Sequence, residues 1–115
     1  MMSSSTLLLI LFTTLALSAG QVLFKLAAMD GESTRSLLQL LLSWKMITAL
    51  SVYGIATLAW VYALRSVPLT LAYPFVALAY VIVPILAHFL LGEVISARTI
   101  AGAVFIIFGV WLSTT

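Results

Sequence analysis

The sequence predicts an all-α membrane protein with four transmembrane helices and a short interfacial helix before the second span. Hydrophobic residues make up 64% of the 115 residues and charged residues only 7%, with a mean hydropathy of +1.29. A soluble domain of this size needs far more charge to cover its surface. The apolar residues also fall into four long runs, each long enough to cross a bilayer as a helix. We therefore expect a single transmembrane domain over residues 1–115.

The remaining composition excludes several functions. The chain has no cysteine, which excludes disulfides and thiolate metal sites. Its five basic and three acidic residues are too few and too scattered for nucleic-acid binding. The sequence shows no Ser/His/Asp set, no paired carboxylates within a span, no phosphate loop and no metal-ligand spacing. We expect neither an enzyme nor a bound cofactor or metal.

The first predicted span covers residues 6–29, roughly 36 Å as a helix. The apolar run up to Gly20 ends in LALSAG, which resembles the end of a signal peptide. However, no basic residue precedes the run and hydrophobic residues continue beyond Gly20, so we favour a membrane span. A turn at residues 30–34 follows, with Thr34 as its expected helix N-cap. Residues 36–42 then predict an interfacial helix, with Trp44 and Lys45 after it at headgroup level.

The other three spans are expected over residues 46–64, 68–91 and 97–113. Pro68 separates the second span from the third, because proline disfavours helix just before itself and suits a first helical turn. The third span should stop at Gly92. It contains Pro74 and Pro84, and each proline removes one backbone donor, so we expect kinks there.

The distribution of basic residues predicts a topology. Lys25, Arg35, Lys45 and Arg98 lie towards one side and Arg65 alone towards the other. The positive-inside rule then places both termini outside the cytoplasm. This bias favours a parallel homodimer, or a heterodimer with an oppositely biased relative, over an antiparallel homodimer.

The first span carries a polar stripe. Thr14, Ser18, Gln21 and Lys25 recur at intervals of four, three and four residues, which places them on one face of a helix. A polar stripe in a membrane helix usually faces protein or a water-filled path. Lys25 alone is equally consistent with an anchor whose side chain reaches the headgroups. Together with Gln21 and Ser18 it favours a lined cavity, where its charge suits a phosphate or another anionic group.

Two more spans each show one polar or aromatic face at helical spacing. The residues are Tyr53, Thr57 and Trp60 in the second span and Tyr73, Tyr80, Pro84 and His88 in the third. Any single aromatic residue of this kind usually serves packing or the interface belt, and a lone histidine is usually a hydrogen-bonded interior residue. Three helices with one such face each favour a shared cavity.

The candidate substrate-binding residues are therefore Ser18, Gln21, Lys25, Tyr53, Trp60, Arg65, Tyr73, Tyr80 and His88. Arg65 and Glu93 lie at span ends, where a solvated boundary role is the simpler interpretation of both. In the fourth span, Gly102 and Gly109 lie seven residues apart with Phe105 near the same face. Small residues at this spacing let helices approach closely. Packing within the chain would explain them, but so small a chain makes a poor cavity alone, and we expect dimerisation through this span.

Three segments resemble a known family. AGQVLFK (19–25), PLTLAYP (68–74) and LLGE (90–93) occur in an order and spacing that resemble the drug/metabolite transporter superfamily. The resemblance covers nearly the whole chain and points to the four-helix, small-multidrug-resistance-like or EamA-like members. It is greatest to the small subunits that flip undecaprenyl-phosphate-aminoarabinose. It implies a multi-pass protein of the bacterial inner membrane that acts with a second copy or a related four-helix subunit.

One departure from the superfamily affects the expected substrate. Multidrug members carry a glutamate in the middle of helix one, whereas the first acidic residue here is Asp30. The resemblance therefore implies a flippase for a polyprenyl-phosphate-linked sugar, an anionic amphiphile. It implies that Lys25, with Arg65, engages the phosphate, and that Gln21 and Ser18, together with three tyrosines, bind the sugar. A proton-coupled multidrug or metabolite exporter, or an accessory subunit of a membrane glycosylation complex, are the alternatives.

Overall fold

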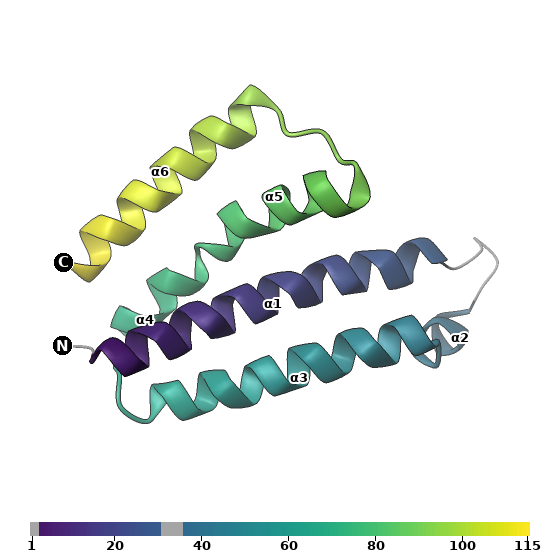
Figure 1. The fold of residues 1–115 in the computed structure, drawn as a ribbon, viewed down its shortest axis with the longest axis horizontal. Coiled ribbons are helices and arrows are strands. Elements are labelled where there is room, and N and C mark those ends of the chain that lie inside the picture. Colours follow the sequence, from purple (N-terminus) through teal and green to yellow (C-terminus); the bar gives the residue numbers. More distant parts are fainter. Residues whose placement is uncertain (1–2, 31–35) are drawn as a thin grey trace.

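A computed structural model describes residues 3–30 and 36–115, and the regular secondary structure in these ranges is entirely helical (Figure 1). The helices are α1 (Ser4–Asp30), α2 (Leu37–Leu41), α3 (Trp44–Leu64), α4 (Leu69–Val76), α5 (Ala79–Leu91) and α6 (Ala97–Thr114). The spans long and apolar enough to cross a membrane are Ser4–Met29, Trp44–Leu64, Leu69–Leu91 and Ala97–Thr114. This confirms the predicted fold class. Of the turn expected at residues 30–34, Asp30 ends α1, and the remainder with its N-cap Thr34 lies outside the described residues.

The short helix before the second span is α2, and local side chains define where it begins. Ser36 accepts a hydrogen bond from the Gln39 backbone, and the Gln39 side chain accepts one from the Ser36 backbone. This reciprocal capping box satisfies donors that a helix start leaves open. The α3 helix follows directly, with Ser43 as its N-cap and an exposed Trp44 at its first position. Sequence-local hydrogen bonds thus fix the entry to the second span.

The α1 helix organises the bundle. It lies between α3 on one side and α4 and α5 on the other, while α6 contacts α4 and α5 at the outer edge (Figure 1). Within an 18-residue apolar window of each span, 33% of the first span is buried, against 6% of the fourth. The molecule measures 49 × 36 × 18 Å. Because one helix with its side chains is about 10 Å across, the helices form a thin open layer rather than a closed bundle.

Small residues bring α1 and α3 together. Ala49, Ala56 and Ala63 recur every seven residues along α3 and are almost completely buried. Opposite them, Gly20 of α1 lies so close to Tyr53 that an added Cβ would sit 3.2 Å from the tyrosine Cδ2. In hydrocarbon, helices associate through close van der Waals packing of this kind. The contact between α1 and α3 is therefore the most extensive in the chain.

The hydroxyl groups buried in α1 are satisfied within the helix itself. Thr13, Thr14 and Ser18 are 0% exposed. Each donates a hydrogen bond of 2.8–2.9 Å to the carbonyl four residues earlier. Because each hydroxyl bonds to a carbonyl of its own helix, it needs no partner on another helix, and its burial leaves no polar group unsatisfied. This part of the predicted polar stripe thus serves the packing between helices.

The third span is interrupted beside α1. The α4 helix ends at Val76, two residues beyond Pro74, and α5 begins at Ala79, five residues beyond it. Between them, the amides of Ala77 and Leu78 bond to carbonyls three residues earlier, at 3.1 Å each. Proline supplies no amide donor and clashes with the carbonyl four residues earlier, which weakens the helix up to Pro74, and the tighter winding follows within one turn. The kink predicted around Pro74 therefore takes the form of a break between two helices, and Pro84 lies inside α5.

A left-handed turn ends α5. Gly92 has φ +73°, and the amides of Gly92 and Glu93 both donate to the Ala87 carbonyl. The His88 ring adds a hydrogen bond from Nδ1 to the Glu93 carbonyl oxygen, at 2.8 Å. These bonds satisfy carbonyls that a helix end leaves open. The chain then runs without regular structure to Ser96, which caps α6 by accepting the Thr99 amide.

The Gly92→Ala variant tests the importance of this turn. A Cβ at Gly92 would meet no atom within 4 Å, so the cost comes only from the left-handed backbone. We expect a loss of about 1–2 kcal/mol in the free energy of unfolding, measured by denaturant titration in detergent micelles. Gly54→Ala is the matched control, because its Cβ also meets nothing and the backbone there is helical. A cost of equal size in both variants would contradict the explanation.

Candidate substrate-binding cleft

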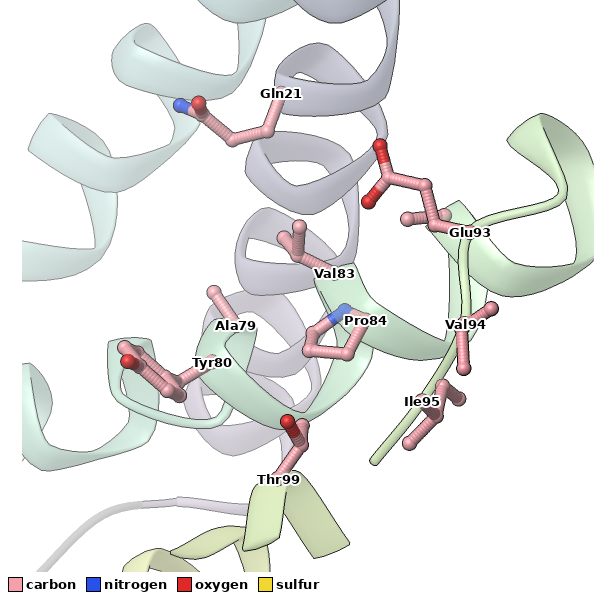
Figure 2. Close-up of a pocket in the computed structure, with 10 residues that line it drawn as sticks. Gln21, Ala79, Tyr80, Val83, Pro84, Glu93, Val94, Ile95 and Thr99 are labelled. Carbon is pink, nitrogen blue, oxygen red and sulfur yellow. The ribbon is translucent and has the colours of Figure 1, made fainter. Parts of the chain in front are cut away.

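A cleft of about 580 Å³ opens between α1, α5 and the connection to α6. Its lining residues are Gln21, Ala79, Tyr80, Val83, Pro84, Ala87, Glu93, Val94, Ile95 and Thr99. Figure 2 shows Val83 and Pro84 between the side chains of Gln21 and Tyr80 and the segment 93–95. The cleft therefore draws its walls from helices that are distant in the sequence.

Four of the ten lining residues are polar. Gln21 comes from α1, Tyr80 from α5, Glu93 from the connection and Thr99 from the first turn of α6. Together they offer an amide, two hydroxyls and one carboxylate, which suits a polar group with several hydrogen-bonding atoms. Gln21 and Tyr80 were predicted as substrate-binding residues, and the structure brings these two to one cleft.

Two polar residues of the cleft, Glu93 and Thr99, were missed by sequence reasoning, and Glu93 is the charged one. The left-handed turn at Gly92 reverses the chain after α5 and turns the Glu93 carboxylate back towards α1 (Figure 2). Among the described residues, no ion pair holds this carboxylate. Its position at the end of a span suggested only a solvated boundary charge. The Gly-Glu pair directly after an apolar run was the available signal, but the direction of the side chain depends on the turn.

An apolar groove of about 470 Å³ adjoins the cleft. It runs between α5 and α6 and shares Pro84, Ile95 and Thr99 with the cleft. The rest of its lining is Val81, Ile85, His88, Ile100, Ala103, Val104 and Ile107. His88, a predicted site residue, thus lines the groove, while its ring caps the turn after α5. A polar cleft that continues into an apolar groove has the chemical profile of a site for an amphiphile.

The aromatic candidates of the second span and the start of the third lie elsewhere. Tyr53 packs against Phe24 with ring centroids 5.5 Å apart, within the contact of α1 and α3. Trp60 and Tyr73 meet edge to face across α3 and α4, with centroids 6.4 Å apart. None of the three candidates lines the cleft or the groove. Their proposed contact with substrate stays a prediction.

The two candidate cations lie at opposite ends of the molecule. Lys25 is exposed and follows Gln21 by one helical turn, about 6 Å along α1. Arg65 caps the far end of α3, with its guanidinium 5.2 Å from the Tyr62 ring centre. The neighbouring Ala63 packs against Ile10, which lies about 22 Å along α1 from Lys25. The structure therefore places Lys25 near the Gln21 end of the cleft and does not bring Arg65 to it.

The predicted dimerisation face on α6 is not packed against any other part of the described chain. Phe105 is 77% exposed, and a Cβ added at Gly102 or Gly109 would meet nothing within 4 Å. These glycines consequently do not serve close packing inside the described structure. Their role at a subunit interface stays a prediction.

Comparison with known proteins gives the family. The EamA-like transporter family matches residues 2–115, nearly the whole chain. The chain belongs to the EamA-like transporter family. With its four membrane-spanning segments, this EamA-like transporter is a multi-pass protein of the bacterial inner membrane.

Several curated proteins are similar to this EamA-like transporter. A probable 4-amino-4-deoxy-L-arabinose-phosphoundecaprenol flippase subunit ArnE of Yersinia pseudotuberculosis is 35% identical over 106 residues, 91% of this chain and 92% of that protein. A probable subunit ArnF of the same kind of flippase, from Photorhabdus laumondii, is 36% identical over 69 residues, 58% of this chain and 55% of that protein. The resemblance inferred from the sequence motifs is confirmed. No solved structure matches the chain.

The Ser18→Ala variant tests whether this predicted site residue contacts substrate. The Ser18 hydroxyl is fully buried and already bonded to the Thr14 carbonyl. We expect the variant to unfold within about 0.5 kcal/mol of the wild type, because donor and acceptor belong to the same helix. Ligand retention, measured by native mass spectrometry, should also be unchanged. Loss of ligand in a stably folded Ser18→Ala protein would instead place this hydroxyl in the site.

Proposed function

We propose that this transporter is a subunit of a flippase that moves a polyprenyl-phosphate-linked sugar across the inner membrane. The observation that carries the proposal is the polar cleft that shares a wall with an apolar groove. A sugar needs hydrogen-bonding groups, whereas a polyprenyl chain needs an apolar surface. The names of the relatives, which refer to an amino-sugar-linked phosphoundecaprenol, support the same substrate class.

In this proposal Lys25 binds the lipid phosphate. Its ammonium group provides a positive charge one helical turn beyond Gln21, and the flexible lysine stem spans that distance. Gln21 and Tyr80 then offer hydrogen bonds to the sugar. A helix without acidic residues between Ser4 and Met29 suits an anionic ligand better than a lipophilic cation, which a nearby lysine repels.

The open shape of the chain supports a second subunit in the proposed transporter. A layer 18 Å thick leaves both broad faces of the helices uncovered, and α6 exposes Phe105 beside two glycines. We propose that α6 packs against a second four-helix subunit. Relatives carry two different subunit names, ArnE and ArnF, which supports a heterodimer, and a parallel homodimer is equally compatible with the charge distribution.

Replacing Lys25 tests the phosphate contact. Native mass spectrometry of the purified protein with undecaprenyl phosphate should show retention by the wild type and a loss of about tenfold or more in Lys25→Ala, because one charge-assisted hydrogen bond contributes about 1.5–3 kcal/mol. Lys25→Arg should keep most of the retention, since the positive charge remains.

Arg98→Gln is the matched control for this experiment. It also removes one positive charge, and Arg98, which like Lys25 lines neither the cleft nor the groove, lies on α6 instead of one turn beyond Gln21 on α1. It should retain the lipid as the wild type does. Full retention by Lys25→Ala would contradict the phosphate contact, and exclusive binding of a lipophilic cation by the wild type would favour a multidrug exporter instead.

A Gly102→Leu/Gly109→Leu double variant tests the subunit contact. A Cβ added at either glycine meets no described atom within 4 Å, so we expect folding of the single subunit to be unaffected. Bulk on this face should separate helices that pack closely, and we expect the dimer fraction in native mass spectra to fall several-fold. Gly54→Leu, at another open helical position, is the control. Equal dimer fractions in all three proteins would exclude this face as the interface.

A further inference from the structure

We propose that Glu93 binds the ammonium group of a zwitterionic lipid head group, one that carries both a phosphate and an amine. This inference rests on the proposed function and identifies a group in the same cleft that would select the head group. A neutral sugar or a bare phosphate would leave Glu93 without a charged partner.

The position of Glu93 is the first argument. It is the one acidic side chain that lines the cleft, and no other described residue forms an ion pair with it. The Gly92 turn and the hydrogen bond from His88 to the Glu93 carbonyl fix the backbone on either side. The backbone of Glu93 is therefore fixed at the cleft wall, and its exposed carboxylate is turned towards α1 (Figure 2).

The chemistry of the neighbouring residues is the second argument. A carboxylate and an ammonium group form short charge-assisted hydrogen bonds, roughly twice as strong as neutral ones. Lys25 does not itself line the cleft, but it follows the lining residue Gln21 by one helical turn and supplies the opposite charge beside the cleft. A site with one anion and one cation is complementary to a ligand that carries both charges.

The adjoining groove indicates that this ligand is a lipid. The walls shared by the cleft and the groove allow one molecule to occupy both. A free zwitterionic metabolite would leave the apolar side chains of the groove without a partner, whereas a lipid chain would cover them. An amino-sugar-linked polyprenyl phosphate has this chemistry, and so does phosphatidylethanolamine. The experiment must therefore distinguish these two sources.

The experiment compares each amine-containing lipid with its N-acetylated form, which lacks the positive charge of the ammonium group. The probes for native mass spectrometry are undecaprenyl phosphate carrying 4-amino-4-deoxy-L-arabinose, the same lipid after chemical N-acetylation, and phosphatidylethanolamine with and without N-acetylation. Undecaprenyl phosphate alone is the reference for phosphate binding. The proteins are the wild type, Glu93→Gln and the control Arg98→Gln, each checked for folding by circular dichroism.

We expect the wild type and Arg98→Gln to retain the amine form of one lipid about tenfold better than its acetylated form. Glu93→Gln should lose this preference and still retain undecaprenyl phosphate as the wild type does. A preference confined to the amino sugar assigns the site to the sugar lipid, and a preference confined to phosphatidylethanolamine assigns it to that phospholipid. Either result supports ammonium binding by Glu93.

Two results would overturn the inference. One is equal retention of amine and acetylated forms by the wild type, and the other is a preference that persists in Glu93→Gln. In both cases retention of undecaprenyl phosphate that depends on Lys25 would leave the proposed function intact. Failure of the wild type to retain any phosphate lipid would instead contradict the proposed function itself.

Discussion

Inside a bilayer, every backbone N–H and C=O group must find its partner within the protein, and the structure depends on this constraint. The spans are helical because a helix pairs its own backbone groups. Thr14 and Ser18 are tolerated in the buried face of α1 because their hydroxyls return to carbonyls of the same helix. The break between α4 and α5 lies against α1, where Thr14 Oγ1 comes within 3.5 Å of the Phe75 carbonyl. One side of the irregular backbone in the third span thus faces α1.

Hydropathy predicted the number and approximate positions of the spans because crossing a membrane requires a long apolar run. The polar stripe on the first span was harder to interpret. Periodicity places Ser18, Gln21 and Lys25 on one face, but the neighbouring helices divide that face into a buried, a cleft-lining and an exposed part. Glu93 was not recognised as a cleft residue, because its position in the sequence indicates only the end of a span. In the structure, the turn at Gly92 directs its carboxylate into the cleft. Which helix packs over each turn of α1 depends on the tertiary structure, and a single sequence does not show it.

The helices pack closely on one side of α1 and loosely on the other, and the cleft and the groove lie on the loosely packed side. Small residues bring α1 and α3 into close contact, and this helix pair has the most extensive contact in the described structure. On the other side, α6 contacts only α4 and α5 extensively, and both the cleft and the groove open there. A loosely covered side is where a ligand or a second subunit has room to bind, and it is also where stability contributed by the single chain is lowest.

The connection between α5 and α6 has a consequence for the depth of the cleft in the membrane. Residues 92–96 have no helical hydrogen-bond ladder, and hydrocarbon offers no partner for most of their backbone groups. Water and lipid head groups must solvate this segment, so it lies in the interfacial layer. Because Glu93, Val94 and Ile95 form one wall of the cleft, that wall lies in the interfacial layer. A lipid bound against it would keep its head group hydrated while its chain stays in the hydrocarbon.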